Sequence, residues 1–252
     1  YVKWDAFIDQ ADKLNAKYIV TGHYAQIDRD GENFIIKKGV DPIKDQSYVL
    51  WGIPKETISR TILPLGGLTK KEVRQIASDN DLETANTPES MEICFVADNN
   101  YKRFLKDYSS KEMSKIGKGK IVNESNEPIG EHDGYPNYTV GQRKGVGLAH
   151  TNPRYVKSIN KDLNTVMISE KKNMFSSRCN VSQENWLVDV SKLPIQIEAQ
   201  IRYNSKPVKC KISDKNELAV DFEEPQFAVT PGQSIVFYKD DVLLGGGIIE
   251  TK

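Results

Sequence analysis

The chain has 252 residues, enough for two or three hydrophobic cores, and its 38% hydrophobic and 28% charged residues are ordinary for a globular protein. No apolar run approaches the roughly 20 residues that span a bilayer, so we expect no membrane partner. Three cysteines are too few for a disulfide scaffold and predict a reducing, cytoplasmic setting. The balance of 35 basic and 35 acidic residues neither supports nor excludes nucleic acid, because a local basic face can bind phosphate on a neutral protein.

Apolar residues recur at helical spacing from Trp4 to Leu14, which predicts an amphipathic helix. The apolar run 18–20 predicts a buried strand, and a polar turn with Gly22 follows. Helix, strand and glycine turn in this order are typical of an α/β sheet, whose ligands bind beyond the carboxyl ends of the strands. Gly22 would let a ligand approach the backbone, although a plain turn glycine explains it equally well. Because the sequence begins within a helical pattern and without methionine, we expect an upstream segment.

The segment 27–38 predicts a β-hairpin with its turn at 30–32. A polar loop, 39–47, follows and offers a cation, an anion and an amide at Lys44, Asp45 and Gln46. On the sequence alone such a group is more typical of a solvated turn than of a binding loop.

A capping box of Thr69 and Glu72 predicts the start of a second helix. The stretch 99–108 predicts a charged helix, with Tyr101 and Tyr108 near its ends. Basic residues accumulate there and beyond it: Lys102, Arg103, Lys106, Lys111, Lys115, Lys118 and Lys120. They can be a solvated face or a stripe that contacts phosphate, with the tyrosines as stacking groups.

Cys94 lies in a short apolar run between an acidic turn and that charged helix. A free cysteine packs as a small hydrophobe, and its neighbours Ile93 and Phe95 suit a core strand, so a core position is the simpler interpretation. A nucleophilic thiol would need a lowered pKa and access to its substrate. This stretch alone leaves both interpretations open.

Short β segments and glycine turns from Gly117 onward predict a small β-rich central domain. From about Asn180 apolar residues alternate with period two, over 195–201, 208–212 and 218–222, which predicts a small β-barrel or sandwich.

Cys210 lies on an apolar face of this last part and is expected in its core; Cys179 is expected to be inert as well. The three histidines, His23, His132 and His150, lie far from any cysteine pair. No metal-ligand spacing results, and no tightly bound metal is predicted.

Taken together, eight stretches resemble the bacterial-type tRNA-uridine 2-sulfurtransferases, also called tRNA 2-thiouridylases. They occur in the order of that family, from near the first residue to near the last: 21–25, 44–48, 64–70, 92–95, 130–134, 138–147, 202–203 and 229–234. Each stretch is short, but the ordered set is specific.

The resemblance implies an α/β domain of the adenine nucleotide alpha-hydrolase-like type, present in part over 1–108. A small β-rich central domain over 109–175 and a C-terminal β-barrel over 176–252 would follow, with tRNA bound across all three. The implied activity is ATP-dependent 2-thiolation of the wobble uridine, position 34, by adenylation of its C2 oxygen and sulfur transfer from a cysteine persulfide. Implied partners are tRNA and a sulfur-donor or sulfur-relay protein, with Mg²⁺ accompanying the nucleotide.

The resemblance also implies roles for individual residues. Cys94 matches the cysteine that carries the sulfur, and a disulfide bond with a partner cysteine belongs to that chemistry. Gly22 matches a glycine that contacts ATP. The other matches are positions that contact tRNA: His23, Lys44, Asp45, Gln46, Arg202, Tyr203 and Gln233.

Two departures from the family pattern bear on activity. The Ser-Gly-Gly-x-Asp-Ser loop for ATP and the first catalytic cysteine have no counterpart in the sequence; we expect both upstream of Tyr1, so the chain alone should be incompetent. Glu92 stands where many members have glycine, and a carboxylate two residues from Cys94 would oppose thiolate formation if it faced the thiol. A non-catalytic tRNA-binding protein without the ATP loop is the main alternative. A small-molecule ligase is disfavoured by the central-domain and barrel matches.

Overall fold

The computed structural model describes residues 2–87, 96, 98, 100–146, 153–192, 196–214 and 218–250. Cys94 and Glu92 lie outside the described residues. The chain divides into two compact units. The first comprises 1–87, 177–225 and 231–252, and the second 88–176 and 226–230.

The first unit begins with the predicted helix and strand. Helix α1 spans Val2–Lys13, and strand β1, Ile19–Val20, pairs in parallel with β4, Thr61–Ile62. Trp4 anchors the helix, because its buried indole N–H donates to the Thr61 hydroxyl at 3.3 Å. The second predicted helix is α2, Lys70–Asp79, and its capping box is confirmed. Short 3₁₀ helices occupy Ser47–Leu50, Lys55–Arg60 and Glu83–Asn86.

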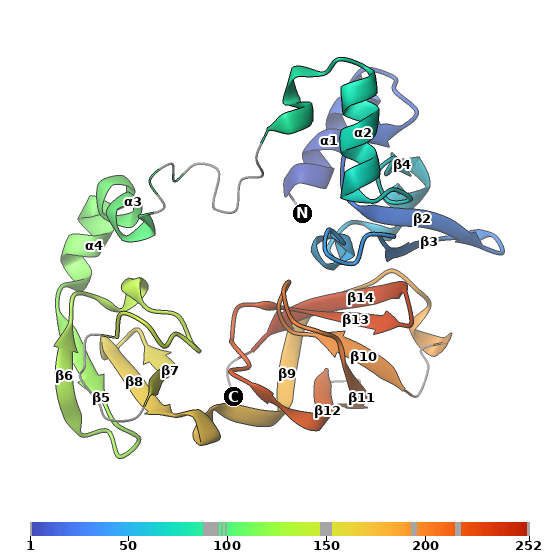
Figure 1. Cartoon of the computed structure of the whole chain (residues 1–252). Helices are drawn as coiled ribbons and strands as arrows, with labels where there is room; N and C mark the ends of the chain where they lie inside the picture. The colour runs from blue at the N-terminus through green and yellow to red at the C-terminus, as the bar shows by residue number, and fades with distance from the viewer. Residues whose placement is uncertain are drawn as a thin grey trace. The chain divides into compact units, whose positions relative to one another are not determined.

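The predicted hairpin forms as β2, Ala25–Asp30, and β3, Asn33–Lys38. Its partner lies far along the chain: β3 pairs with β14, Val242–Ile249, and Leu243 lies opposite Ile36. The hairpin thereby extends the sheet of the C-terminal part, and β2 forms its outer edge (Figure 1). Sequence periodicity predicted the hairpin but not this attachment.

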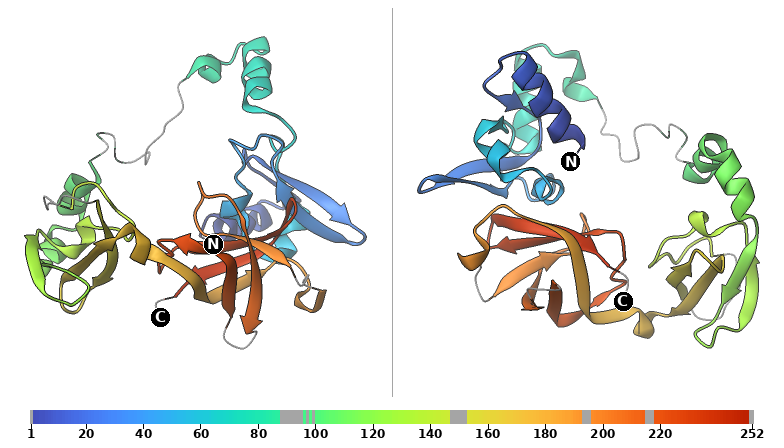
Figure 2. Two further views of the ribbon diagram at one scale, coloured as in Figure 1. Left: turned by 60° about the horizontal axis from the view of Figure 1, so that its bottom comes forward. Right: turned by 180° about the vertical axis from the view of Figure 1, so that it is seen from behind.

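The remaining strands of the first unit form the closed barrel seen in Figures 1 and 2. They run in the order β13-β10-β11-β12-β9-β14, and β13 pairs with β14 to close the ring. The strands are β9 Phe175–Trp186, β10 Ile197–Gln200, β11 Val208–Asp214, β12 Ala219–Phe227 and β13 Ser234–Lys239. A further 3₁₀ helix spans Val190–Lys192.

Most apolar residues of the predicted period-two face are buried where the strands are described, although Gln200 and Ala219 between them are buried too. Ile197, Ala199 and Ile201 are buried, as are Val220 and Phe222. Facing side chains of this kind fill a small barrel and stabilise it by removing apolar surface from water.

Cys210 is confirmed in the barrel core, with 1% of its surface exposed. Burial raises the pKa of its thiol to about 12. Cys179 is buried as well.

The second unit contains helices α3, Tyr101–Tyr108, and α4, Ser110–Ile116, and a four-stranded sheet in the order β6-β5-β8-β7. Its strands are β5 Gly119–Val122, β6 Pro128–His132, β7 Arg154–Asn160 and β8 Thr165–Glu170, with 3₁₀ helices at Tyr135–Asn137 and Lys171–Met174. Ile121, Val156 and Val166 form its core, each fully buried. The predicted β-rich central part is confirmed.

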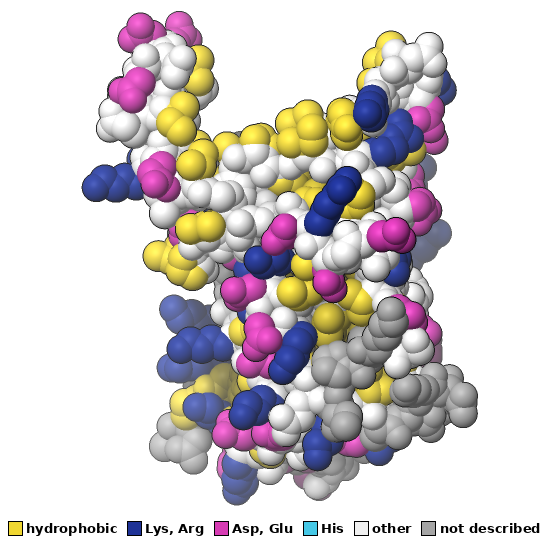
Figure 3. All heavy atoms as spheres, turned by 90° about the vertical axis from the view of Figure 1, so that its right-hand side faces the viewer, with side chains coloured by type: hydrophobic (Ala, Val, Ile, Leu, Met, Phe, Trp, Pro, Cys, Tyr) yellow, Lys and Arg dark blue, Asp and Glu magenta, His cyan; other side chains and the backbone are white. Residues whose placement is uncertain are grey.

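Among the described residues, no helix is both long enough and apolar enough to cross a membrane. On the face drawn in Figure 3, basic and acidic side chains are interspersed, and hydrophobic side chains gather along its upper part.

Candidate functional site

The loop 39–47 is held by the side chains of two of its own predicted site residues. The Asp45 carboxylate accepts hydrogen bonds from the Gly39 N–H at 2.8 Å, from the Ser47 N–H at 3.1 Å and from the Ser47 hydroxyl at 2.9 Å. The Gln46 side-chain oxygen accepts from the Tyr24 N–H at 3.0 Å, and the Gln46 N–H donates to the Tyr24 carbonyl at 2.8 Å. These side-chain oxygens therefore fix the loop that presents Lys44.

Asp41 is a third residue that fixes the loop, and it was not among the predicted site residues. Its carboxylate accepts from the Ile43 N–H at 3.0 Å, from the Lys44 N–H at 3.3 Å and from the Lys70 N–H at the start of α2 at 2.9 Å. The pair Asp41-Pro42 is the signal that could have identified it, because aspartate before proline favours a turn closed by its side chain.

Replacing Asp41 with asparagine should make folding less sensitive to acid. The N–H of Lys70 is the largest cause that holds the pKa of the Asp41 carboxyl below its usual value. Its stabilising effect is therefore present above the pKa of the unfolded state and lost as pH falls through the lower folded value. Urea unfolding midpoints measured between pH 7 and pH 3 should fall less steeply for Asp41→Asn than for wild type; parallel curves would contradict this role.

A loop of the barrel contacts the loop 39–47 directly. The Tyr203 hydroxyl donates to the Asp45 carbonyl at 3.0 Å, and the Tyr203 ring lies edge-on to Tyr48 with centroids 6.0 Å apart. The Tyr48 hydroxyl donates to the carbonyl of Ser234 at 2.8 Å, and burial raises its pKa to about 12. The structure thus brings together Asp45 and Tyr203, two predicted site residues that are far apart in the sequence.

Between these two loops lies a cavity of about 740 Å³. It is lined by polar and aromatic residues that include Gln26, Lys38, Asp45, Tyr48, Gln200, Tyr203 and Lys206. The side-chain N–H groups of Gln200 donate to the carbonyls of Arg202 and Tyr203 at 3.1 and 2.7 Å, so Gln200 supports the barrel loop from inside.

Arg202 lies in this barrel loop and Gln233 directly before β13, and neither is among the residues that line the cavity. Arg202 is half-buried, and burial lowers the pKa of its guanidinium from its ordinary high value. Gln233 is partly buried just before β13, and its carbonyl accepts the Ile249 N–H at 2.9 Å.

Gly22 and His23 follow the carboxyl end of β1, at a separate place in the same unit. The His23 Nδ1 lies 2.8 Å from the Thr21 hydroxyl, and its ring packs 5.4 Å from that of Trp4. A Cβ built on the exposed Gly22 would meet only the Leu65 side chain, at 3.6 Å. A side chain at this position would therefore meet only ordinary contact, and the turn lies beyond the carboxyl end of β1, where an α/β sheet binds its ligands.

The two tyrosines of helix α3, Tyr101 and Tyr108, already form contacts within the second unit. The Tyr101 hydroxyl donates to the Asn137 carbonyl at 3.0 Å, and Tyr108 stacks on Phe104 with centroids 5.4 Å apart. Arg103 forms ion pairs with Asp98 and Asp107 at 2.6 and 2.7 Å. These contacts favour a solvated, internally paired face around Arg103, and the role of the lysines beyond it stays open.

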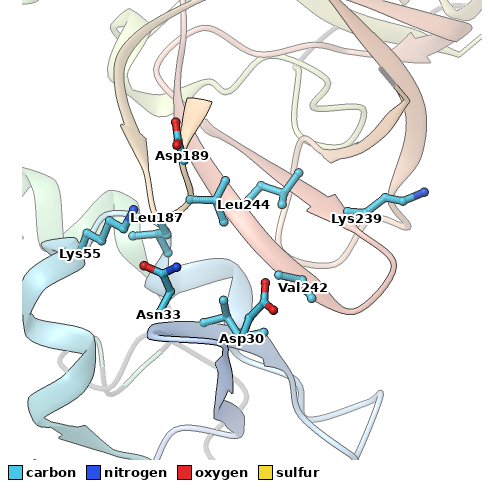
Figure 4. A pocket seen from close by; sticks show the side chains of 10 residues that line it. Asp30, Asn33, Lys55, Leu187, Asp189, Lys239, Val242 and Leu244 are labelled. Atoms are coloured by element: carbon cyan, nitrogen blue, oxygen red, sulfur yellow. The ribbon is translucent and has the colours of Figure 1, made fainter. Parts of the chain in front are cut away.

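The first unit has a second cavity of about 600 Å³ (Figure 4). It opens where the strand paired with β14 changes from β9 to β3. Apolar residues such as Leu187 and Val242 line it beside charged ones such as Lys55 and Asp189, and no predicted site residue is among them. In the part of the chain that the structure describes, no group of three or more His, Cys, Asp or Glu side chains could hold a metal ion.

Comparison with known proteins gives three matches to family models, in chain order. A tRNA methyl transferase HUP domain matches residues 1–98, a tRNA methyl transferase PRC-barrel domain matches 102–170, and an aminomethyltransferase beta-barrel domain matches 176–249. These matches confirm the predicted fold class. The predicted domain boundaries at 108/109 and 175/176 stay predictions.

Curated relatives match over the whole chain. The tRNA-specific 2-thiouridylase MnmA of Carboxydothermus hydrogenoformans is 44% identical over 257 residues, which cover 100% of this chain and 70% of the relative. The proteins of the same name from Lachnoclostridium phytofermentans and Salinibacter ruber are 42% and 41% identical over 99% of this chain and 70% and 67% of their own lengths.

The order of HUP domain, PRC-barrel and β-barrel defines a multidomain chain of the tRNA-modifying class. Because these relatives match this chain over 99–100% of its length, the chain belongs to the tRNA-specific 2-thiouridylase family, as its motifs predicted.

Proposed function

We propose that this protein acts in the ATP-dependent 2-thiolation of tRNA, at the wobble uridine, and that Cys94 carries the sulfur as a persulfide. The observation that carries the proposal is the 44% identity over the whole chain to a protein named tRNA-specific 2-thiouridylase. The HUP match to residues 1–98 supports nucleotide binding by this part.

The proposed chemistry divides between substrate activation and sulfur delivery. ATP, with Mg²⁺, supplies the adenylate that turns the C2 oxygen of uridine into a leaving group. The terminal sulfur of the Cys94 persulfide bonds to C2 as the C2–O bond breaks, and the S–S bond then breaks as Cys94 forms a disulfide with a partner cysteine. A dithiol reductant would first reduce that disulfide to two thiols, and a sulfur-donor or relay protein would then transfer the outer sulfur of its own persulfide to the Cys94 thiolate. Gly22 would hold the nucleotide, because it lies exposed in the turn after the carboxyl end of β1 and has no side chain to keep a ligand from its backbone.

The proposed tRNA contacts are His23, Lys44, Asp45, Gln46, Arg202, Tyr203 and Gln233. Within this set the side-chain oxygens of Asp45 and Gln46 already accept hydrogen bonds inside the loop. We therefore propose that Asp45 and Gln46 contact tRNA through the backbone of the loop, and that Lys44 and Arg202 bind its phosphates.

The test is a thiolation assay with ATP, Mg²⁺, a sulfur source and unmodified tRNA, read out by mass spectrometry of tRNA nucleosides. It is run on the chain alone and on the chain fused to the part of the C. hydrogenoformans relative that the match leaves uncovered, with that relative as positive control. Formation of 2-thiouridine at the wobble position supports the proposal. Binding of tRNA without thiolation in either preparation would favour a non-catalytic tRNA-binding protein.

Replacing Lys44 or Arg202 with alanine should weaken tRNA binding uniformly across tRNA species. Each cation that pairs with a phosphate releases condensed counterions, so its loss should reduce the slope of log affinity against log salt by about 1. Filter binding between 50 and 300 mM salt measures both effects. Lys239→Ala, at the other cavity, is the matched control. A variant that binds like wild type at every salt concentration would not contact phosphate.

A further inference from the structure

We propose that His132 is a pH-sensitive switch of the second unit: the neutral imidazole holds the turn 133–138 closed, and protonation of the ring opens it. His132 is the last residue of β6, where it lies opposite Gly119 of β5 (Figure 1). The inference concerns the second unit alone and does not rest on the proposed function, so it can be tested without tRNA or thiolation.

The imidazole of His132 is enclosed by its neighbours. Only 4% of the residue is exposed, and the Tyr138 ring lies edge-on to the imidazole with centroids 5.3 Å apart. On the side of β5, a Cβ built on Gly119 would come within 2.6 Å of the ring carbon Cε1. The ring therefore packs against bare backbone on this side and has little room to move away.

The hydrogen bond between His132 and the turn fixes the protonation state of the ring. The Gly134 N–H donates to Nδ1 at 3.0 Å, and this bond is buried. A ring nitrogen that accepts is unprotonated, so Nε2 carries the proton and the imidazole is neutral. Nε2 is itself buried without a well-aligned hydrogen-bond partner in the described part of the chain. A second proton would have to bind Nδ1, where the Gly134 N–H already points, and the bond would be lost.

The surroundings of the ring favour its neutral form. Burial is the largest influence on the pKa of His132 and lowers it below its ordinary value. The Asn164 carbonyl and the charge of Asp133 act in the opposite direction and are weaker. Burial raises the pKa of the Tyr138 phenol, which therefore stays neutral beside the ring. Exposed charged side chains flank the ring along the two strands: Lys118, Lys120 and Glu131.

The turn that His132 closes is also attached to helix α3. The Asn137 side-chain N–H groups donate to the carbonyls of Asp133 and Gly134 at 2.8 and 3.3 Å, and the Asn137 carbonyl accepts the Tyr101 hydroxyl of α3 at 3.0 Å. Residues of this turn and of helices α3 and α4 line a cavity of about 790 Å³. Opening of the turn would therefore displace one wall of the cavity and loosen the attachment of α3.

The direction of the pH effect follows from the two states of the ring. An exposed histidine titrates near pH 6.5, whereas the enclosed ring of the closed turn has a lower pKa, so the open form binds the proton more strongly. The closed turn is therefore fully stable above about pH 6.5 and loses stability as pH falls below that value, down to the pKa of the closed form.

The test is amide hydrogen exchange of the whole chain, measured by NMR between pH 7.5 and pH 5.5 and corrected for the intrinsic exchange rate. Protection of the Gly134 N–H should fall by about 3- to 10-fold over this range. Protection of Val156, whose N–H donates to the Gln142 carbonyl in the core of the unit, should stay constant. At pH 7.5 the ¹⁵N shifts of the His132 ring should identify Nδ1 as the unprotonated nitrogen.

His132→Asn is the decisive variant, because its amide oxygen can replace Nδ1 as the acceptor but does not titrate. Protection of Gly134 in this variant should be equal at both pH values. His23→Asn is the matched control: His23 belongs to the first unit, so the fall at Gly134 should be that of wild type.

Constant protection of Gly134 in wild type, an equal fall in His132→Asn, or an equal fall at Val156 would overturn the inference. A proton on Nδ1 at pH 7.5 would do so as well. Should His132→Asn fail to fold by circular dichroism, the exchange of the two wild-type amides and the ring shifts still decide.

Discussion

Replacing Cys94 with serine should reduce 2-thiouridine formation below detection in the active preparation while tRNA affinity stays unchanged. A hydroxyl cannot form a persulfide, so the sulfur has no carrier, whereas the loops proposed to bind tRNA are untouched. Mass spectrometry of tRNA nucleosides and filter binding measure the two effects on the same protein. Normal thiolation by Cys94→Ser would reject the role proposed for this thiol.

Cys210→Ala is the matched control for the cysteine. Cys210 is 1% exposed, and burial raises its pKa to about 12, so it carries little thiolate at neutral pH and cannot reach a substrate. Thiolation per folded molecule should therefore match wild type, although the melting temperature should fall because a core side chain is shortened. Loss of activity in a folded Cys210→Ala protein would show that the assay reports stability rather than chemistry.

Replacing Gly66 with alanine should destabilise the first unit by about 3 kcal/mol or more. A Cβ at Gly66 would lie within 2.4 Å of both the carbonyl carbon and the oxygen of Ala25, and backbone cannot yield as a flexible side chain can. The Gly66 carbonyl also accepts the Val40 N–H at 2.9 Å, so displacement of this turn would loosen the loop 39–47 as well. Urea unfolding gives the loss of stability, and filter binding should show weaker tRNA binding.

Gly67→Ala is the control, one residue along the same turn. A Cβ built there meets no atom of another residue within 4 Å, and its φ is not in the left-handed region. Its free energy of unfolding should stay within about 0.5 kcal/mol of wild type. Equal stability of the Gly66→Ala and Gly67→Ala proteins would contradict the packing around Gly66.

The candidate site could be predicted from the sequence only in part. The motif at 44–46 marked this loop as a candidate site, but it did not reveal that the Asp45 carboxylate and the Gln46 side-chain oxygen accept hydrogen bonds that fix it. It also missed Asp41, whose third bond reaches Lys70, 29 residues further on. A sequence pattern gives the type of a side chain, whereas its partners depend on which distant segments fold against it.

What the sequence by itself determined are the features set by near neighbours. The Thr69 and Glu72 capping box, the hairpin over 27–38 and the period-two strands of the barrel follow from contacts within a few residues. Tertiary structure alone decided that β3 pairs with β14, that Tyr203 donates to Asp45, and that a cavity lies between their loops. These contacts join residues more than 150 positions apart, and their register is set by packing of the whole unit, which local propensity does not encode.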